Sequence, residues 1–220
     1  MTVLLVLLTF LTFIVIDYLL SRKRVAVEAR AERPAPEFEE TFVEGFRVPK
    51  RLRYHPGHTW ILRERKNLVR VGIDEFAAAL MGKIARIELP RPGLWIRQGQ
   101  KIFSFYRDGE KAEMVSPTEG EIVEVNQDAL RDPAVLRNDP YGSGWLLVVH
   151  SPDDETVSRN LVPRNLVREW MREAVERLYR KQPQLAGAVA ADGGRPVEDL
   201  FSALPGESWK ALTEEFFLPR

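Results

Sequence analysis

Residues 101–125 read KIFSFYRDGEKAEMVSPTEGEIVEV, and this stretch decides the fold of the chain. Two runs of strand-forming residues flank a short polar group at Arg107-Asp108-Gly109-Glu110. Asp-Gly between such runs is typical of a β-hairpin with a type I′ turn, because both central residues of that turn need positive φ. Lys111 lies just past the turn, so the stretch predicts a hairpin that carries a lysine out of a small β-domain.

Composition excludes several classes of function. The chain has 220 residues, of which 45% are hydrophobic and 29% charged, as expected of a folded globular chain. Its formal net charge is zero, so the overall charge gives no sign of nucleic-acid binding. The absence of cysteine excludes disulfides, thiol nucleophiles and iron–sulfur ligation.

The first 22 residues are predicted to form a membrane anchor. Residues 3–20, VLLVLLTFLTFIVIDYLL, would span about 27 Å as a helix, close to the hydrocarbon thickness of a bilayer. The basic group Ser21-Arg22-Lys23-Arg24 follows at once, which predicts a single pass through the inner (cytoplasmic) membrane of a bacterium with the C-terminal domain in the cytoplasm. The alternative is a cleaved signal peptide, but that would need a basic start, and Met1-Thr2 leads directly into the apolar run.

The rest of the chain divides into three predicted parts. Residues 23–50 are rich in charge and proline and are expected to be a linker. Residues 51–160 contain many short strand patterns, typical of a small barrel or sandwich, with a short helix after Asp74 that ends at Gly82. Residues 161–220 form a helical extension, in which an apolar stripe over 163–181 and a second helix over Trp209 to Phe217 are expected to pack on the β-domain. The alternative for the stripe is contact with a membrane surface or a partner.

Five motifs in the middle of the chain resemble those of one family. They are YHPGHTW (54–60), VGIDEFA (71–77), ELP (88–90), SPTEGEIVEVN (116–126) and NDPYGSGW (138–145). In this order and spacing they resemble the H protein of the glycine cleavage system. The resemblance covers about residues 52–160 and implies a mainly β, barrel-sandwich hybrid fold of the lipoyl type.

The resemblance also implies a function without catalysis. In that family a lysine at a hairpin tip is lipoylated, and the lipoyl arm carries an aminomethyl group between the enzymes of the glycine cleavage system. Lys111 is the candidate for lipoate attachment here, and His58 matches a family histidine thought to line the cleft where the loaded arm rests. No catalytic residue follows from the resemblance, and His55 and His58 lack the third ligand that a zinc site would need.

The hairpin departs from the family pattern. The family lysine stands eight residues before the proline of Ser-Pro, whereas Lys111 stands six before Pro117, and counting eight back gives Gly109. Either the hairpin is shortened and Lys111 is still at the tip, or Asp108-Gly109 is the tip and the lysine is lost. Turn chemistry favours the second alternative, since Asp-Gly supplies positive φ at the tip.

Two hypotheses about function follow from this departure. In the first, the chain is a membrane-anchored carrier or scaffold with a degenerate lipoylation hairpin, and its partners are glycine-cleavage-type enzymes or another membrane-associated complex. In the second, Lys111 bears lipoate and the chain carries an aminomethyl or acyl group in a one-carbon pathway. A third class, the adaptor proteins of efflux pumps, would need a long helical insertion where this chain has only RDGEKAE.

Overall fold

The computed structural model describes residues 10–16, 40–152, 160–181, 199–203 and 208–218, which belong to two compact units, Met1–Pro34 and Ala35–Arg220. In the first unit residues 10–16 are helical with exposed apolar side chains such as Phe10 and Phe13. Within the described ranges, no helix has both the length and the apolar character needed to cross a bilayer. The predicted span over 3–20 extends beyond these ranges at both ends and stays a prediction.

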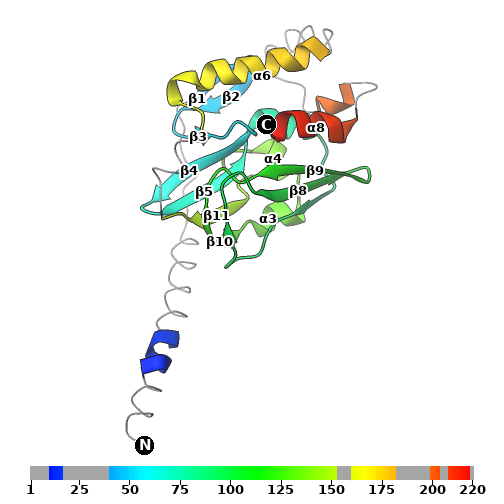
Figure 1. Cartoon of the computed structure of the whole chain (residues 1–220). Coiled ribbons are helices and arrows are strands. Elements are labelled where there is room, and N and C mark those ends of the chain that lie inside the picture. The colour runs from blue at the N-terminus through cyan, green and yellow to red at the C-terminus, as the bar shows by residue number, and fades with distance from the viewer. Residues whose placement is uncertain (1–9, 17–39, 153–159, 182–198, 204–207, 219–220) are drawn as a thin grey trace, which may run out of the picture. The chain divides into compact units, whose positions relative to one another are not determined.

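The second unit is built on two main antiparallel sheets, which confirms the mainly β expectation (Figure 1). The larger sheet has six strands in the order β3-β4-β5-β11-β10-β7, and the smaller has the order β6-β8-β9. The strands of the larger sheet are β3 (Arg53–Tyr54), β4 (Thr59–Arg65), β5 (Leu68–Ile73), β7 (Trp95–Ile96), β10 (Gly120–Val125) and β11 (Leu147–His150). Those of the smaller sheet are β6 (Arg86–Glu88), β8 (Lys101–Arg107) and β9 (Glu110–Val115).

One hydrophobic core joins the two sheets. Val71 and Val149 contribute to it from the larger sheet, and Phe103 and Phe105 from the smaller. Trp60 is one of its largest side chains and is fully buried, with its indole N–H donating to the Ile73 carbonyl at 2.7 Å. Burial of such side chains supplies most of the free energy that holds two small sheets together.

Three short helices lie between strands. The helix predicted after Asp74 is confirmed as α2 (Glu75–Met81), in which the Asp74 carboxylate accepts from the Ala77 N–H as an N-cap and Gly82 ends the helix at φ 64°. The long connection after β10 holds α3 (Gln127–Arg131), capped by Asn126, and α4 (Val135–Asn138).

The domain begins earlier than the sequence suggested, because the last part of the expected linker 23–50 is folded. Strands β1 (Glu40–Val43) and β2 (Phe46–Pro49) form a separate two-stranded hairpin. Val43, Phe46 and Val48 alternate inward and join the core, and the Phe46 ring packs edge-on against Phe76 at 5.4 Å. Charged residues lie among these apolar positions, so the alternation of apolar side chains is too short to be recognised and the sequence predicts a linker.

The C-terminal extension packs on the β-domain, as expected. It consists of the 3₁₀ turns η1 (Arg164–Leu166) and η2 (Phe201–Ala203) and the helices α6 (Val167–Lys181) and α8 (Trp209–Phe217). Helix α6 contacts β1, and α8 lies beside β9, where it covers the edge strand of the smaller sheet (Figure 1). The buried apolar side chains of these two helices are Val167, Met171, Ala174, Val175, Leu178, Trp209, Leu212, Phe216 and Phe217.

Candidate functional site

The tip of the β8–β9 hairpin is a two-residue turn. Arg107 pairs with Glu110 as the last cross-strand pair, which leaves only Asp108 and Gly109 in the turn. Their φ values are 49° and 85°, so both central residues have the positive φ of a type I′ turn. A Cβ atom added to Gly109 would meet nothing within 4 Å, so a side chain at this position has open space around it. Asp108-Gly109 is therefore the tip, as turn chemistry indicated, and no lysine stands there.

Lys111 lies on the flank of the hairpin. It pairs with Tyr106 across the ladder, and its Nζ donates to Glu113 Oε1 at 2.8 Å. Its side chain is 44% exposed. This hydrogen bond to the Glu113 carboxylate raises the pKa of Lys111 above its ordinary value, and the same contact lowers the pKa of Glu113. The lysine is thus an ion-paired, half-exposed side chain near the start of β9.

The outer face of the smaller sheet surrounds Lys111 with further polar contacts. The Tyr106 hydroxyl donates to Glu88 Oε2 at 2.7 Å, and the Arg86 guanidinium lies 3.9 Å from the centre of the Tyr106 ring. Lys101 Nζ is 3.2 Å from the second carboxylate oxygen of Glu113. Each carboxylate on this face therefore lies beside a cation or a hydroxyl donor.

The inner side of the hairpin is held by Arg107. Its guanidinium donates to Asp199 Oδ1 and Oδ2 at 2.9 and 3.1 Å and to the Ser202 hydroxyl at 2.8 Å. It also donates to the Met81 carbonyl at 3.0 Å and lies 4.8 Å from the centre of the Phe201 ring. Two parallel bonds to one carboxylate are the strongest arrangement available to arginine, so the hairpin and the extension are joined at this point. We call this group of residues the Arg107 clamp.

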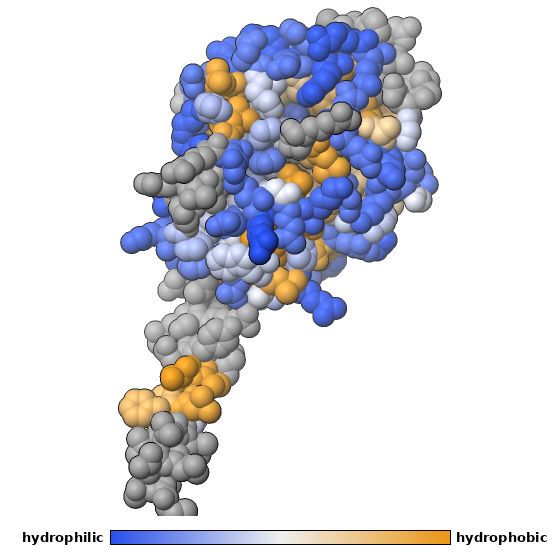
Figure 2. Space-filling view, viewed as in Figure 1, coloured by the Kyte–Doolittle hydropathy of each residue, from blue (hydrophilic) through white to orange (hydrophobic). Residues whose placement is uncertain are grey.

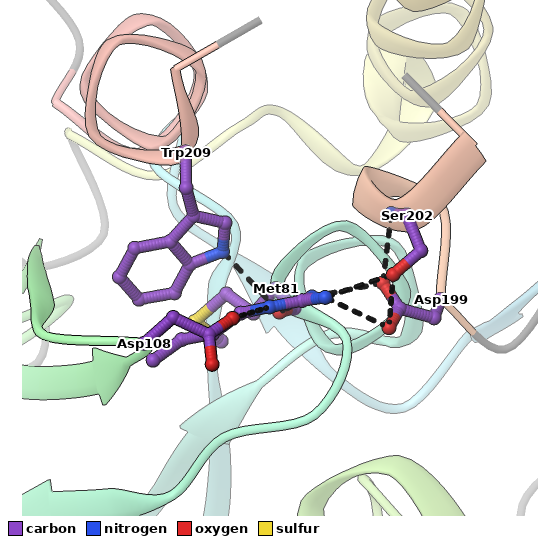
Figure 3. Close-up of polar contacts among 6 residues, drawn as sticks. Met81, Asp108, Asp199, Ser202 and Trp209 are labelled. Carbon is purple, nitrogen blue, oxygen red and sulfur yellow. Dashed lines mark hydrogen bonds and ion pairs between the residues drawn. The ribbon is translucent and has the colours of Figure 1, made fainter. Parts of the chain in front are cut away.

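The clamp also satisfies the end of α2. The Met81 carbonyl belongs to the last turn of that helix and has no partner within it. It accepts from Arg107 and, at 3.3 Å, from the Trp209 indole N–H. Figure 3 shows Met81 between Trp209 on one side and Asp199 and Ser202 on the other, with Asp108 nearby. A side chain at Gly82 would collide with Asp199 and Arg107, so this glycine lets the clamp approach the helix end.

His58 is completely buried beneath the extension. Its Nδ1 lies 2.8 Å from Asp74 Oδ2, and because a carboxylate only accepts, Nδ1 carries the proton. The imidazole lies between two rings, Phe76 at 4.5 Å and Trp170 of α6 at 4.7 Å, and Phe217 of α8 meets it edge-on at 6.4 Å. The histidine that the resemblance places in a cleft is here covered by side chains of the chain's own C-terminal helices.

His55 and His150 do not join a polar cluster. His55 is buried, and its Nδ1 accepts from the Gly57 N–H at 3.0 Å, while His150 is exposed at the end of β11. Burial, and then the neighbouring His58, lower the pKa of His55 to about 4. Among the residues that the structure describes, no group of three or more histidines, aspartates or glutamates could hold a metal ion.

Sequence reasoning missed two features of this region. The sequence predicts only that Arg107 belongs to the turn region, whereas its partner Asp199 is 92 residues away, and no local pattern predicts such a contact. The cover over His58 was also missed, although Trp170 and Phe217 were expected to pack on the domain. The only sequence signal for either was the aromatic content of the extension, which indicated burial without naming the surface.

Known proteins match the central part of the chain. Residues 52–174 match the glycine cleavage H-protein family. A glycine cleavage system H protein of Bifidobacterium longum is 36% identical over 108 residues, which cover 49% of this chain and 78% of that protein. One of Prochlorococcus marinus is 35% identical over 117 residues, 53% of this chain and 90% of that protein. A crystal structure of an H protein from Mycobacterium marinum covers 47% of this chain and 86% of its own, with 34% identity and a TM-score of 0.44. The chain belongs to the glycine cleavage H-protein family.

Proposed function

We propose that this chain is a membrane-anchored, non-catalytic member of the H-protein family that docks protein partners and does not carry lipoate on its hairpin. The observation that supports this most directly is the two-residue turn Asp108-Gly109. The position eight residues before Pro117, where the resemblance expects the modified lysine, is the glycine of that turn.

The setting of Lys111 supports the same proposal. A lipoyl amide forms when a neutral amine attacks the activated carboxyl group, and the contact with Glu113 favours the charged form of Lys111. A ligase must also find the lysine in a defined frame at an exposed tip, whereas Lys111 lies back on the strand opposite Tyr106. The Arg107 clamp holds the inner side of the hairpin, which opposes a shift of the strands that would bring Lys111 to the tip.

The cover over His58 adds an independent argument. A carrier of the family type would need room beside this histidine for its loaded arm. Trp170 and Phe76 occupy both faces of the imidazole in this chain, and Phe217 meets its edge. The extension therefore fills the space that the resemblance assigns to an arm, as expected if the arm is no longer used.

The membrane part of the proposal rests on the sequence of residues 3–24. The apolar run and the basic group after it would hold the domain at the cytoplasmic face of the inner membrane. The docking partners would then be membrane-associated proteins. The alternative, a lipoylated aminomethyl or acyl carrier that serves glycine-cleavage-type enzymes, is favoured by one observation, the 44% exposure of the Lys111 side chain.

Intact-protein mass spectrometry distinguishes the two functions. The full chain is co-expressed with a lipoyl ligase, beside an H protein of known lipoylation as a positive control and the variant Lys111→Arg. We expect both the chain and the variant to have the masses calculated from their sequences, without a lipoyl adduct, while the control H protein gains the mass of a lipoyl group. A lipoyl adduct that maps to Lys111 and disappears in the variant would establish the carrier instead.

A further inference from the structure

A groove with an apolar floor opens between the β1–β2 hairpin and the start of α6. Its volume is about 330 Å³, at the lower end of the range typical of small-molecule sites. The floor consists of buried side chains, among them Val48, Leu52 and Val167. The groove is lined by Thr41, Val48, Pro49, Lys50, Leu52, Tyr54, Arg164, Val167 and Arg168. This lining contains three cationic residues and no carboxylate.

The cations lie at the rim. Arg164 and Arg168 are one helical turn apart, are both exposed, and form no ion pair with a carboxylate of the described residues. The Arg164 guanidinium donates to the Lys50 carbonyl at 3.4 Å, which holds the two sides of the rim together. Leu166, with 49% of its surface exposed, lies between the two arginines in sequence. The groove therefore places two exposed arginines beside an apolar floor, and apolar patches rimmed by polar residues are typical of binding sites.

The surface view shows the same arrangement. In Figure 2 apolar side chains are exposed over the start of α6 and the β1–β2 hairpin, and hydrophilic side chains border them. The formal net charge of the whole chain is zero, whereas Arg164 and Arg168 at this groove have no carboxylate beside them among its lining residues. A ligand that complements it has an anionic head and an apolar tail.

We propose that this groove binds an anionic phospholipid of the membrane to which the chain is anchored. Arg164 and Arg168 would bind the phosphate, because the planar guanidinium forms paired hydrogen bonds to phosphate oxygens. The start of an acyl chain would cover Val48, Leu52 and Val167, and Leu166 would lie among the neighbouring lipids. The anionic lipids of a cytoplasmic membrane surface attract arginines that lie close to it. The inference rests on the proposed membrane location, and it would fix the orientation of the domain on the bilayer.

Methyl NMR of the full chain in neutral detergent micelles tests the site. The probe is dioctanoyl phosphatidylglycerol, and the expected result is a saturable shift of the Val48, Leu52 and Val167 methyl signals. The double variant Arg164→Gln/Arg168→Gln should weaken this binding about 30-fold, since each cation near an anionic surface contributes a factor of about five. The matched control Arg91→Gln/Arg97→Gln removes two exposed arginines that do not line the groove, and it should bind like the unchanged chain.

Three results would overturn the inference. One is the absence of methyl shifts, and another is an equal response to dioctanoyl phosphatidylcholine, which has no net charge. The third is an equal response to inorganic phosphate, which would make the groove a site for the ion alone. Fractionation of the chain with membranes tests the anchor separately. If the protein is found in the membrane fraction but its methyl signals do not shift with lipid, only the lipid site is refuted. If the methyl signals shift saturably but the protein stays out of the membrane fraction, only the anchor is refuted.

Discussion

Returning a lysine to the hairpin tip should restore the modification that this chain is proposed to lack. The change is Gly109→Lys in the background Lys111→Arg, so that the new lysine is the only one in the hairpin beyond Lys101. It places an amine eight residues before Pro117, at the tip of a two-residue turn. With a co-expressed ligase, this variant should gain the lipoyl mass, whereas Lys111→Arg alone should not.

The structure sets the cost of this change. A Cβ atom at Gly109 meets no atom within 4 Å, so the substitution adds no clash. The cost comes from the backbone, because Gly109 has φ 85° and a side chain in that region costs about 1–2 kcal/mol. This is a fraction of the about 5–15 kcal/mol by which domains are stable, so the variant should fold. Gly109→Asn is the matched control, because asparagine tolerates positive φ and supplies no amine.

The assay combines intact mass with urea unfolding of the same preparations. The expected pattern is an adduct on Gly109→Lys only, with a loss of about 1–2 kcal/mol in the free energy of unfolding. If the folded variant stays unmodified while the known H protein is modified, the position of the lysine is not what prevents lipoylation. If the loss in stability exceeds about 3 kcal/mol, a side chain at position 109 does not have open space around it.

Three further predictions concern the folded domain. Trp209→Ala should lower the free energy of unfolding in urea by about 3–5 kcal/mol, and Trp209→Phe by less, because the indole is buried and donates to Met81. If both variants have negligible effects, α8 does not unfold together with the rest of the domain. Hydrogen bonds from Arg107 outweigh burial and lower the pKa of Asp199, so its stabilisation is present above about pH 4 and is lost as the pH falls through that lowered value. Asp199→Asn should cost about 1.5–3 kcal/mol at pH 7 and abolish this pH dependence in thermal melts, a result that an unchanged profile would contradict. Burial lowers the pKa of His55 from 6.5 to about 4, so the free energy of unfolding should fall by about 3 kcal/mol as the pH is lowered from 6.5 to 4. His55→Asn keeps an acceptor for the Gly57 N–H and should remove this dependence in urea titrations at pH 4 to 7.

Local chemistry explains why much of the site could be foreseen. An Asp-Gly pair between two strand patterns is typical of a hairpin turn. The structure has the turn at Asp108-Gly109. Asp74 caps α2 because its side chain reaches the third residue of the helix. Features of this kind depend on neighbours in the chain, so their residue types predict them.

The sequence by itself determined the two-sheet class, the turn at the hairpin tip, the capped helix and the packing of an aromatic extension. Only the tertiary structure decided where that extension packs. The contact of Arg107 with Asp199 and the cover of Trp170 over His58 join segments far apart in the chain. Such pairings depend on how folded elements meet, and any buried surface of the right shape could have accepted the same side chains. This is the physical reason why the motifs predicted the hairpin and the histidine, whereas only the fold shows that the hairpin is clamped and the histidine covered.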